Sequence, residues 1–275
     1  MNRSGRHRAA VIGDPAHHSL SPAIHRAGYE ANGLDWRYEA ITVSAEELDG
    51  FVRARLYDPA WAGLSVTAPH KEAIVAYGEP DEPTRLVGGG NTLVFGPHPK
   101  VYNTDVPGFV RAWRAHGLDR PRSAAILGNG ATARSLVLAL AGLAAREVVV
   151  LARRPERATS ILELTRALGL SAEVRPLGED VGPVDLVAST IPASATAAHA
   201  ASLASGTRVV FDAVYDPWPT PLGTAAEQAG RVSLNGLDLL AGQAVDQFFL
   251  LTGHEVTFED CRSAAGRELK RRSGL

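Results

Sequence analysis

The chain has 275 residues, 45% of them hydrophobic and 21% charged, with a net charge of −2 and the composition of an ordinary globular protein. This length suits two modest domains, and the weak charge argues against nucleic acid or an anionic membrane as a partner. We expect no signal peptide, membrane-spanning helix or internal disulfide, since no apolar run is long enough and Cys261 is the single cysteine, as is typical of a cytoplasmic protein.

The N-terminal part of the chain alternates predicted strands and helices. Strands are expected over residues 8–12 and 36–43, and helices over 21–32 and 45–56. Ser21 precedes Pro22, a pattern typical of an N-cap followed by the first helical turn. Ser19 and Ser21 together also suit an anion pocket, because free N–H groups point outward at a helix N-terminus. The residues alone leave both interpretations open.

The most informative stretch covers residues 63–71. Apolar and hydroxyl-bearing residues alternate over 64–67, which predicts a strand with one apolar face, and Pro69 ends it. Lys71 is expected to start a helix over 71–77. The chain has only three lysines, and a lysine can give up its proton where an arginine cannot. A role in proton transfer and a solvated surface lysine are both compatible with this stretch.

A glycine-rich turn and a hairpin follow. Residues 81–83 are expected to break the chain, and the glycines at 88–90 lead through Asn91 into a hairpin over 93–103. The glycines allow close backbone packing, and Asn91 offers both a donor and an acceptor. Asp105 precedes the next helix, where it is either a helix cap or a carboxylate with a chemical role.

A different pattern begins at residue 123. The motif G-x-G-x-x-A occupies residues 128–133, between a predicted strand over 124–127 and a helix that reaches residue 143. In this context it is the fingerprint of a dinucleotide-binding turn. The first glycine makes the tight turn, the second lets a pyrophosphate approach the backbone, and the helix N-terminus binds its charge.

Three arginines follow the second strand of this unit, which is expected over residues 147–151. They are Arg153, Arg154 and Arg157, and no acidic residue stands at the tip of the strand. NAD sites usually carry Asp or Glu there, whereas guanidinium groups suit the additional phosphate of NADP. We therefore expect NADP; the alternative is an arginine-rich, solvated helix start.

The rest of the chain continues the alternation. Helices are expected over 155–168, 236–251 and 258–271, and strands over 172–174, 185–189 and 209–212. The segment 216–221 contains too many prolines for a regular element. This order predicts a parallel sheet that binds ligands at the carboxyl ends of its strands.

The chain resembles the shikimate dehydrogenase family through motifs that occur in family order over nearly its whole length. Residues 13–25 resemble G-x-P-x-x-H-S-x-S-P-x-x-H, residues 65–71 resemble N-V-T-x-P-x-K, residues 90–92 and 103–105 resemble the two N-T motifs, and residues 212–217 resemble D-x-x-Y-x-P. Residues 128–133 resemble the family's glycine turn, and Gln243 falls on the glutamine of L-x-x-Q-A. Together these motifs are far more specific than any one of them.

The resemblance implies an α/β fold with an N-terminal αβ substrate domain (1–105), a Rossmann-like NADP-binding domain (106–236) and C-terminal helices (237–275) that pack back on the first domain, with the cleft between the two domains. It implies reversible, NADPH-dependent reduction of 3-dehydroshikimate to shikimate in aromatic amino-acid biosynthesis, by a monomer or homodimer without a metal. Alternatives are a quinate/shikimate or aminoshikimate dehydrogenase and a non-catalytic ligand-sensing relative; a quinate enzyme preferring NAD would conflict with Arg153 and Arg154.

By the same resemblance, Lys71 and Asp105 form the catalytic pair. The implied substrate-binding residues are Ser19, Ser21, Ser65, Thr67, Asn91, Tyr215 and Gln243. The implied cofactor-binding residues are Gly128, Asn129, Gly130, Ala131, Thr132, Ala133, Arg153, Arg154, Arg157, Thr190, Ala213 and Gly236. Ser65 stands where the family usually has Asn, which shortens the reach toward the ring and makes this position the expected source of the chain's own specificity. Ala152 also replaces a usual Asn, and Asn129 and Ala131 stand where the family favours Ala and Gly.

Overall fold

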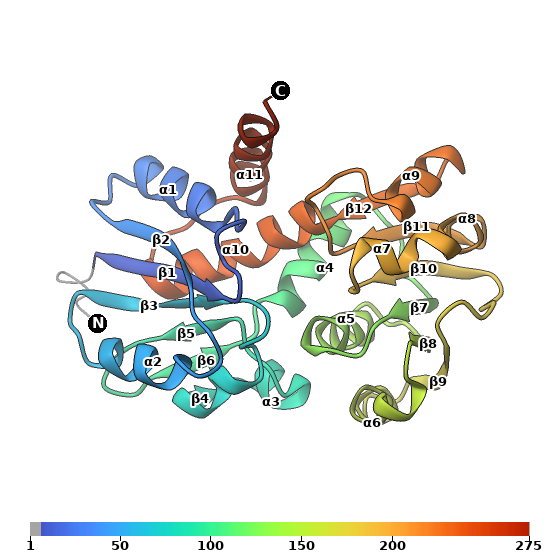
Figure 1. The fold of residues 1–275 in the computed structure, drawn as a ribbon, viewed down its shortest axis with the longest axis horizontal. Coiled ribbons are helices and arrows are strands. Elements are labelled where there is room, and N and C mark those ends of the chain that lie inside the picture. The colour runs from blue at the N-terminus through green and yellow to red at the C-terminus, as the bar shows by residue number, and fades with distance from the viewer. Residues whose placement is uncertain (1–6, 275) are drawn as a thin grey trace. The chain divides into compact units, whose positions relative to one another are not determined.

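The computed structural model of the protein describes residues 7–274. The chain divides into two compact units, the first running to Gly108 and resuming at Leu240, and the second spanning Phe109–Leu239. The divisions fall within two helices, α4 (Asp105–Ala115) and α10 (Gly236–Thr252). Each unit contains a sheet with helices packed on it (Figure 1).

In the first unit, the described residues form a six-stranded mixed sheet with the order β2-β1-β3-β5-β6-β4. Its strands are β1 (Arg8–Gly13), β2 (Arg37–Thr42), β3 (Trp61–Val66), β4 (Glu79–Pro80), β5 (Thr92–Val94) and β6 (Lys100–Tyr102). Its remaining helices are α1 (Ser21–Ala31), α2 (Leu48–Leu56), the 3₁₀ helix η1 (Ala73–Tyr77), α3 (Glu82–Val87) and α11 (Phe258–Ser273). The predicted hairpin is confirmed, since β5 and β6 pair antiparallel.

Side-chain alternation gives this sheet two apolar faces. One face packs against α2, with Ile12 and Leu64 against Val52. The other face packs against α1 and α10, with Val11 in one cluster with Tyr29 and Phe248. α11 in turn packs on α1, so the C-terminal helices return to the first sheet as expected (Figure 1).

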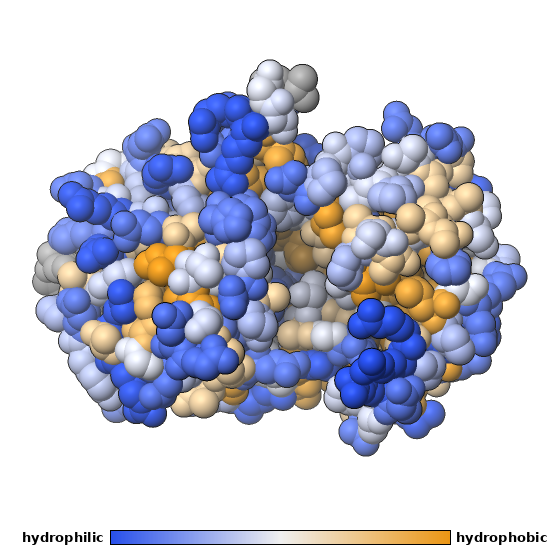
Figure 2. All heavy atoms as spheres, in the orientation of Figure 1, coloured by the Kyte–Doolittle hydropathy of each residue, from blue (hydrophilic) through white to orange (hydrophobic). Residues whose placement is uncertain are grey.

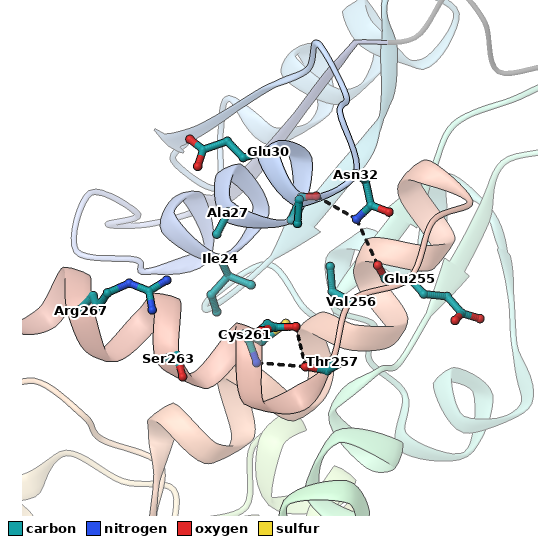
Figure 3. Close-up of a pocket in the computed structure, with 13 residues that line it drawn as sticks. Ile24, Ala27, Glu30, Asn32, Glu255, Val256, Thr257, Cys261, Ser263 and Arg267 are labelled. Carbon is teal, nitrogen blue, oxygen red and sulfur yellow. Dashed lines mark hydrogen bonds between the residues drawn. The ribbon is translucent and has the colours of Figure 1, made fainter.

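A groove of about 470 Å³ lies between α1 and the segment that leads into α11 (Figure 3). Asn32 closes one end, because its Nδ2 donates to Gly28 O at 2.9 Å and to Glu255 O at 3.1 Å. Ile24 and the buried side chain of Cys261 line its wall. The groove is therefore part of the seam through which the C-terminal segment docks on the first unit.

In the second unit, the described residues form a parallel sheet of six strands with the order β12-β11-β10-β7-β8-β9. Its strands are β7 (Ser123–Leu127), β8 (Glu147–Ala152), β9 (Ser171–Pro176), β10 (Val184–Ser189), β11 (Thr207–Asp212) and β12 (Val232–Asn235). Its helices are α5 (Ala131–Gly142), η2 (Pro155–Arg157), α6 (Thr159–Ala167), α7 (Ala193–Thr196), η3 (Ala197–His199), α8 (Ala200–Ser205) and α9 (Pro221–Gln228). This order is the doubly wound arrangement of dinucleotide-binding folds, with its switch point between β7 and β10.

Three local predictions in the first unit are wrong. Residues 81–83 start α3 instead of breaking the chain, because the Asp81 side chain caps the helix by accepting from Thr84 N at 2.8 Å. Ser21 is the first residue of α1 rather than its N-cap, which is Leu20 and makes no side-chain cap. Residues 71–72 lie in a turn, and the helix after them is a short 3₁₀ helix over Ala73–Tyr77.

Other boundaries shift because turns replace the first turn of a predicted helix. Residues 45–47 form a turn before α2, and the helix predicted over 155–168 divides into η2 and α6. The proline-rich segment ends in a regular element, since Thr220 caps α9 and Pro221 is its first residue. Within residues 7–274, none of the helices combines the length and the apolar character that crossing a membrane requires.

Candidate active site

Lys71 and Asp105 form a largely buried ion pair in the first unit. Lys71 Nζ lies 2.5 Å from Asp105 Oδ2, and the two side chains are 16% and 6% exposed. Asp105 Oδ1 accepts from Asn91 Nδ2 at 2.9 Å. Asp105 is also the first residue of α4, where the helix dipole favours a negative charge. Both carboxylate oxygens are thus held by the protein, with an ammonium beside one of them.

Asn91 is the centre of the hydrogen bonds around this pair. Its Oδ1 accepts from Thr104 N at 2.8 Å, and its Nδ2 also donates to Gln243 Oε1 at 3.2 Å. Thr104 Oγ1 lies within hydrogen-bonding distance of the same two amides. Asn91 and Gln243, far apart in sequence, therefore meet beside Asp105, and Asn91 orients its carboxylate.

A close helix crossing brings Gln243 to this place. Gly108 on α4 and Gly242 on α10 pack backbone to backbone, since a Cβ built on Gly242 would lie 2.2 Å from Gly108 O. A Cβ on Gly108 would lie 2.5 Å from Gln243 N. Only glycines allow this approach, because real Cβ atoms do not come so near a backbone atom.

The turn that carries Lys71 is anchored at both ends. His70 is 2% exposed, and its Nε2 donates to Val43 O at 2.7 Å, beyond the end of β2. Lys71 O accepts from Gly90 N at 2.8 Å, which ties the turn to the glycine-rich segment. Thr67, half-buried, begins the turn and donates its N–H to Ile12 O. The role of His70 was not predicted, because its burial depends on where β2 ends.

A second polar group in the first unit contains the three serines predicted to bind substrate, Ser19, Ser21 and Ser65. Ser21 N donates to Ser19 Oγ at 3.2 Å, and the Tyr38 hydroxyl donates to Ser65 Oγ. All four side chains are buried. Burial raises the pKa of the Tyr38 phenol, and hydrogen bonds with Ser65 and Ser21 only partly lower it. Tyr38 is not among the sequence predictions, since nothing local in β2 distinguishes it from a core tyrosine.

The second unit holds a cavity of about 390 Å³ beside the glycine turn. Its lining residues are Gly128, Asn129, Leu151, Ala152, Arg153, Arg154, Arg157, Leu177, Ile191, Pro192, Ser194 and Ala195. Five of these were predicted for the cofactor, and none of the lining residues is acidic. All three arginines are exposed, and strongly hydrophilic residues gather on the visible face over the region of α6 (Figure 2).

The backbone of the glycine turn suits an anionic dinucleotide. Gly128 has a φ of +112°, and a Cβ on it would lie 2.4 Å from Thr190 Oγ1, so only glycine fits there. Gly130 is the N-cap of α5, makes no side-chain cap and has open space beside it. The N-terminus of α5, which has no side-chain cap, therefore suits the negative charge of a phosphate. Together with the arginines, these features fit NADP.

The other predicted cofactor residues lie around this turn or at the end of β11. Thr132 and Ala133 are in the first turn of α5, and Thr190 Oγ1 donates to Leu127 O at 2.9 Å. A Cβ on Gly236 would lie 2.1 Å from Ala213 O and 2.8 Å from Tyr215 Cδ1, so these three residues are neighbours in the second unit.

Two features of the cavity region were missed. The apolar pair Ile191 and Pro192 lines the cavity immediately after β10, at the switch point, which the order of a doubly wound sheet identifies once it is known. Asp212, fully buried, accepts from Thr220 Oγ1 at 2.7 Å and so closes the proline-rich loop that follows Tyr215. Among the described residues, no group of three or more acidic, histidine or cysteine side chains could hold a metal ion.

Known proteins resemble this chain over most of its length. The model of the shikimate dehydrogenase substrate binding domain matches residues 11–93. Shikimate dehydrogenase (NADP(+)) of Methanocella arvoryzae is 34% identical over 251 residues, which cover 88% of this chain and 92% of that protein.

Solved structures are similar over nearly the whole chain. The crystal structure of Mycobacterium tuberculosis shikimate dehydrogenase matches with a TM-score of 0.87 and 36% identity, covering 95% of this chain and 99% of that one. Shikimate 5-dehydrogenase of Thermus thermophilus, solved with NADP(H) and shikimate, matches with a TM-score of 0.81 and 29% identity over the same shares. The chain therefore belongs to the shikimate dehydrogenase family.

Proposed function

We propose that the chain is an NADP-dependent shikimate dehydrogenase, which reversibly reduces 3-dehydroshikimate to shikimate in aromatic amino-acid biosynthesis. We propose that it does so in the cytoplasm, as a monomer or homodimer. The observation that carries the proposal is the Lys71–Asp105 pair at 2.5 Å, set among neutral amide and hydroxyl groups. Relatives that span nearly the same length are named for this activity, and one was solved with both ligands.

The chemistry follows from what each side chain can do with a proton. When bound, NADPH supplies the hydride that reduces the substrate carbonyl. Negative charge then develops on the carbonyl oxygen, and the Lys71 ammonium is the donor that neutralises it. Asp105 holds the ammonium in place and accepts from a neighbouring substrate hydroxyl. In the reverse direction, Lys71 takes the proton back.

Substrate recognition falls to groups of the first unit. Ser19 and Ser21, at the N-terminus of α1, suit a carboxylate because two hydroxyls lie together there, at the positive end of the helix dipole. Thr67, Asn91 and Gln243 suit ring hydroxyls, and a site built from such groups rejects analogues that leave them unpaired. The part of Tyr215, which lies in the second unit, stays a prediction from the family motif.

Cofactor binding falls to the second unit. The turn at 128–133 would hold the pyrophosphate, and Arg153, Arg154 and Arg157 would hold the additional phosphate that distinguishes NADP from NAD. The chain thus divides its tasks as the family does, with a substrate domain over 1–105, a cofactor domain over 106–236 and the returning helices over 237–275.

A spectrophotometric assay tests the proposal. Shikimate, quinate and aminoshikimate are each offered with NADP and with NAD, and reduction of the nicotinamide is followed. We expect shikimate with NADP to give the highest kcat/KM. A higher kcat/KM for quinate or aminoshikimate would instead support those dehydrogenases. Tight binding of shikimate without any turnover would support a ligand sensor and contradict the proposal.

A further inference from the structure

A buried phenol joins two serines that come from distant parts of the chain. Tyr38, on β2, is 4% exposed and donates its hydroxyl proton to Ser65 Oγ on β3. Ser21, the first residue of α1, is its other hydrogen-bonding neighbour. Burial raises the pKa of this phenol, so it stays protonated and remains a donor at neutral pH.

Counting the protons and lone pairs of these hydroxyls indicates which way the Ser65 hydroxyl donates. A phenol has one proton, and a serine hydroxyl has one proton and two lone pairs. With Tyr38 as the donor of this hydroxyl pair, the proton of Ser65 is left for a further acceptor. Ser19 is in a similar position, since its Oγ accepts from Ser21 N. Both serines are thereby set to donate.

The ring of Tyr38 is held firmly. His25 stacks on it with ring centroids 4.0 Å apart and an angle of 11° between the planes. His25 Nε2 lies 3.4 Å from Gln247 Oε1, and Gln247 Nε2 donates to Thr92 Oγ1 at 2.8 Å. Because the amide nitrogen of Gln247 donates to Thr92, the amide oxygen of Gln247 faces His25. The proton of the His25 ring is therefore assigned to Nε2.

Strand register places Ser65 next to the catalytic network. Ser65 pairs with Thr92 across β3 and β5, and paired residues point to the same face of a sheet. The residue before Thr92 is Asn91, whose backbone oxygen accepts from Val66 N at 2.8 Å. The Tyr38–Ser65 contact therefore lies one residue pair from the amide that holds Asp105.

We propose that Tyr38 is a positioning residue for substrate recognition, which turns the Ser65 hydroxyl into an oriented donor toward a substrate oxygen. Ser65 is shorter than the asparagine that the family usually carries at this position. The Tyr38 phenol holds the Ser65 hydroxyl in one orientation. Tyr38 acts through Ser65 and does not itself touch the substrate. This inference rests on the proposed function, because it concerns the ligand of the same site.

The central test replaces Tyr38 by phenylalanine, which removes one oxygen and keeps the ring that stacks on His25. Losing one oriented hydrogen bond is worth about 1 kcal/mol, so we expect KM for shikimate to rise roughly 5- to 10-fold with kcat changed less than about 2-fold. Tyr29→Phe is the matched control. Its hydroxyl is buried in the same aromatic cluster and has no hydrogen-bond partner among residues 7–274, so its removal leaves KM unchanged.

A double-mutant cycle separates positioning from a merely structural role. If Tyr38 acts through Ser65, then Ser65→Ala raises KM by a similar factor, and Tyr38→Phe adds nothing further in that background. Additive effects on KM would overturn the proposal. Because Ser65→Ala leaves Tyr38 intact, an unchanged KM in this single variant would overturn it even if Tyr38→Phe failed to fold.

Calorimetric titration of shikimate into the wild-type protein distinguishes this inference from the proposed function. If the wild-type protein neither binds nor oxidises shikimate, both the proposed function and the role of Tyr38 are contradicted. An active wild type whose Tyr38→Phe variant matches Tyr29→Phe in KM and in shikimate affinity would remove only the role of Tyr38. An active wild type with weakened binding in Tyr38→Phe alone supports both.

Discussion

The polar groups of the first unit and the cofactor cavity of the second unit are built in opposite ways. In the first unit the groups are buried and bonded to one another, and they come from residues as distant as Ser19 and Gln243. In the second unit the loops after two neighbouring strands supply exposed arginines and a helix N-terminus without a side-chain cap. The first arrangement is fixed before a ligand arrives, whereas the second offers charge to whatever approaches.

This contrast separates two ways of binding a ligand, by donors held in a fixed orientation and by electrostatic attraction. A neutral, hydroxylated ring is distinguished by direction, so its donors must already point correctly. A phosphate is held chiefly by charge and tolerates mobile partners. Substitutions in the first unit should therefore leave buried groups unpaired, at a cost of about 1–3 kcal/mol each, while substitutions of exposed arginines should change ligand preference and leave the fold intact.

The largest effect is expected from Lys71→Ala. It removes the proton donor, so we expect kcat to fall about 10²-fold or more, the scale of general acid–base catalysis, with shikimate binding changed only a few-fold. Steady-state kinetics and calorimetry measure the two quantities. Lys100→Ala is the control, because Lys100 is exposed on β6 and its ion pair with Glu79 is long, at 4.0 Å. Near-normal kcat in Lys71→Ala would show that the pair is structural.

The next largest effect concerns the cofactor cavity. Arg153→Ala combined with Arg154→Ala removes two guanidinium groups that line it, so we expect the ratio of kcat/KM for NADP over NAD to fall roughly 10- to 100-fold. The melting temperature should not change, since both side chains are exposed. Arg166→Ala, on the exposed face of α6 outside the cavity, is the matched control. Equal use of NAD by the unmodified protein would contradict the assignment.

The same contrast explains which features the sequence could predict. The glycine turn at 128–133 and the arginines after β8 are local signals, so the strand–turn–helix pattern was sufficient to locate them. Residues 81–83 also carried a local signal, an aspartate N-cap with proline in the first turn, but it was misinterpreted as a chain break.

The first unit's groups could be found only through the family motifs or not at all. Lys71 and Asp105 were expected from motifs, but the approach of Gln243 to Asn91 depends on a helix crossing at Gly108 and Gly242 that no local pattern encodes. Tyr38 and His70 were missed because tertiary packing alone makes a core tyrosine a donor to Ser65 and a turn histidine an anchor on Val43.

The helix crossing offers a test of how strictly the first unit is preorganised. In Gly242→Ala the new Cβ would meet Gly108 O at 2.2 Å, so α10 must shift and carry Gln243 with it. We expect a loss of about 1–3 kcal/mol in the free energy of unfolding and roughly a 10-fold fall in kcat/KM. Denaturant titration and kinetics measure the two.

The control for this crossing is Gly50→Ala on α2. Its Cβ would meet nothing within 4 Å, so it should stabilise the protein by about 0.5–1 kcal/mol without changing kcat/KM. If Gly242→Ala also left kcat/KM unchanged, the position of Gln243 would not matter for turnover, and the contrast between the units would weaken.

The smallest effect concerns the pH dependence of stability. Burial lowers the pKa of His25 from 6.5 to about 3, against the opposing hydrogen bond to Gln247, and the rings around it are the uncharged ones of Tyr38, Phe248 and Tyr29. Between these two pKa values the unfolded chain binds a proton that the folded chain does not. Stability therefore rises with pH in this window and is lost as the pH falls below about 6.5.

Between about pH 7.5 and about pH 5.5 this linkage removes about 1.4 kcal/mol from the free energy of unfolding. His25→Phe keeps a ring against Tyr38 and removes the titrating group, so denaturant titrations at the two pH values should show a correspondingly smaller difference than in the wild type. His98→Phe, in the exposed turn between β5 and β6, should retain the wild-type difference. If His25→Phe retained it as well, the buried network would tolerate a proton, and its closure against solvent would be less complete than its hydrogen bonds indicate.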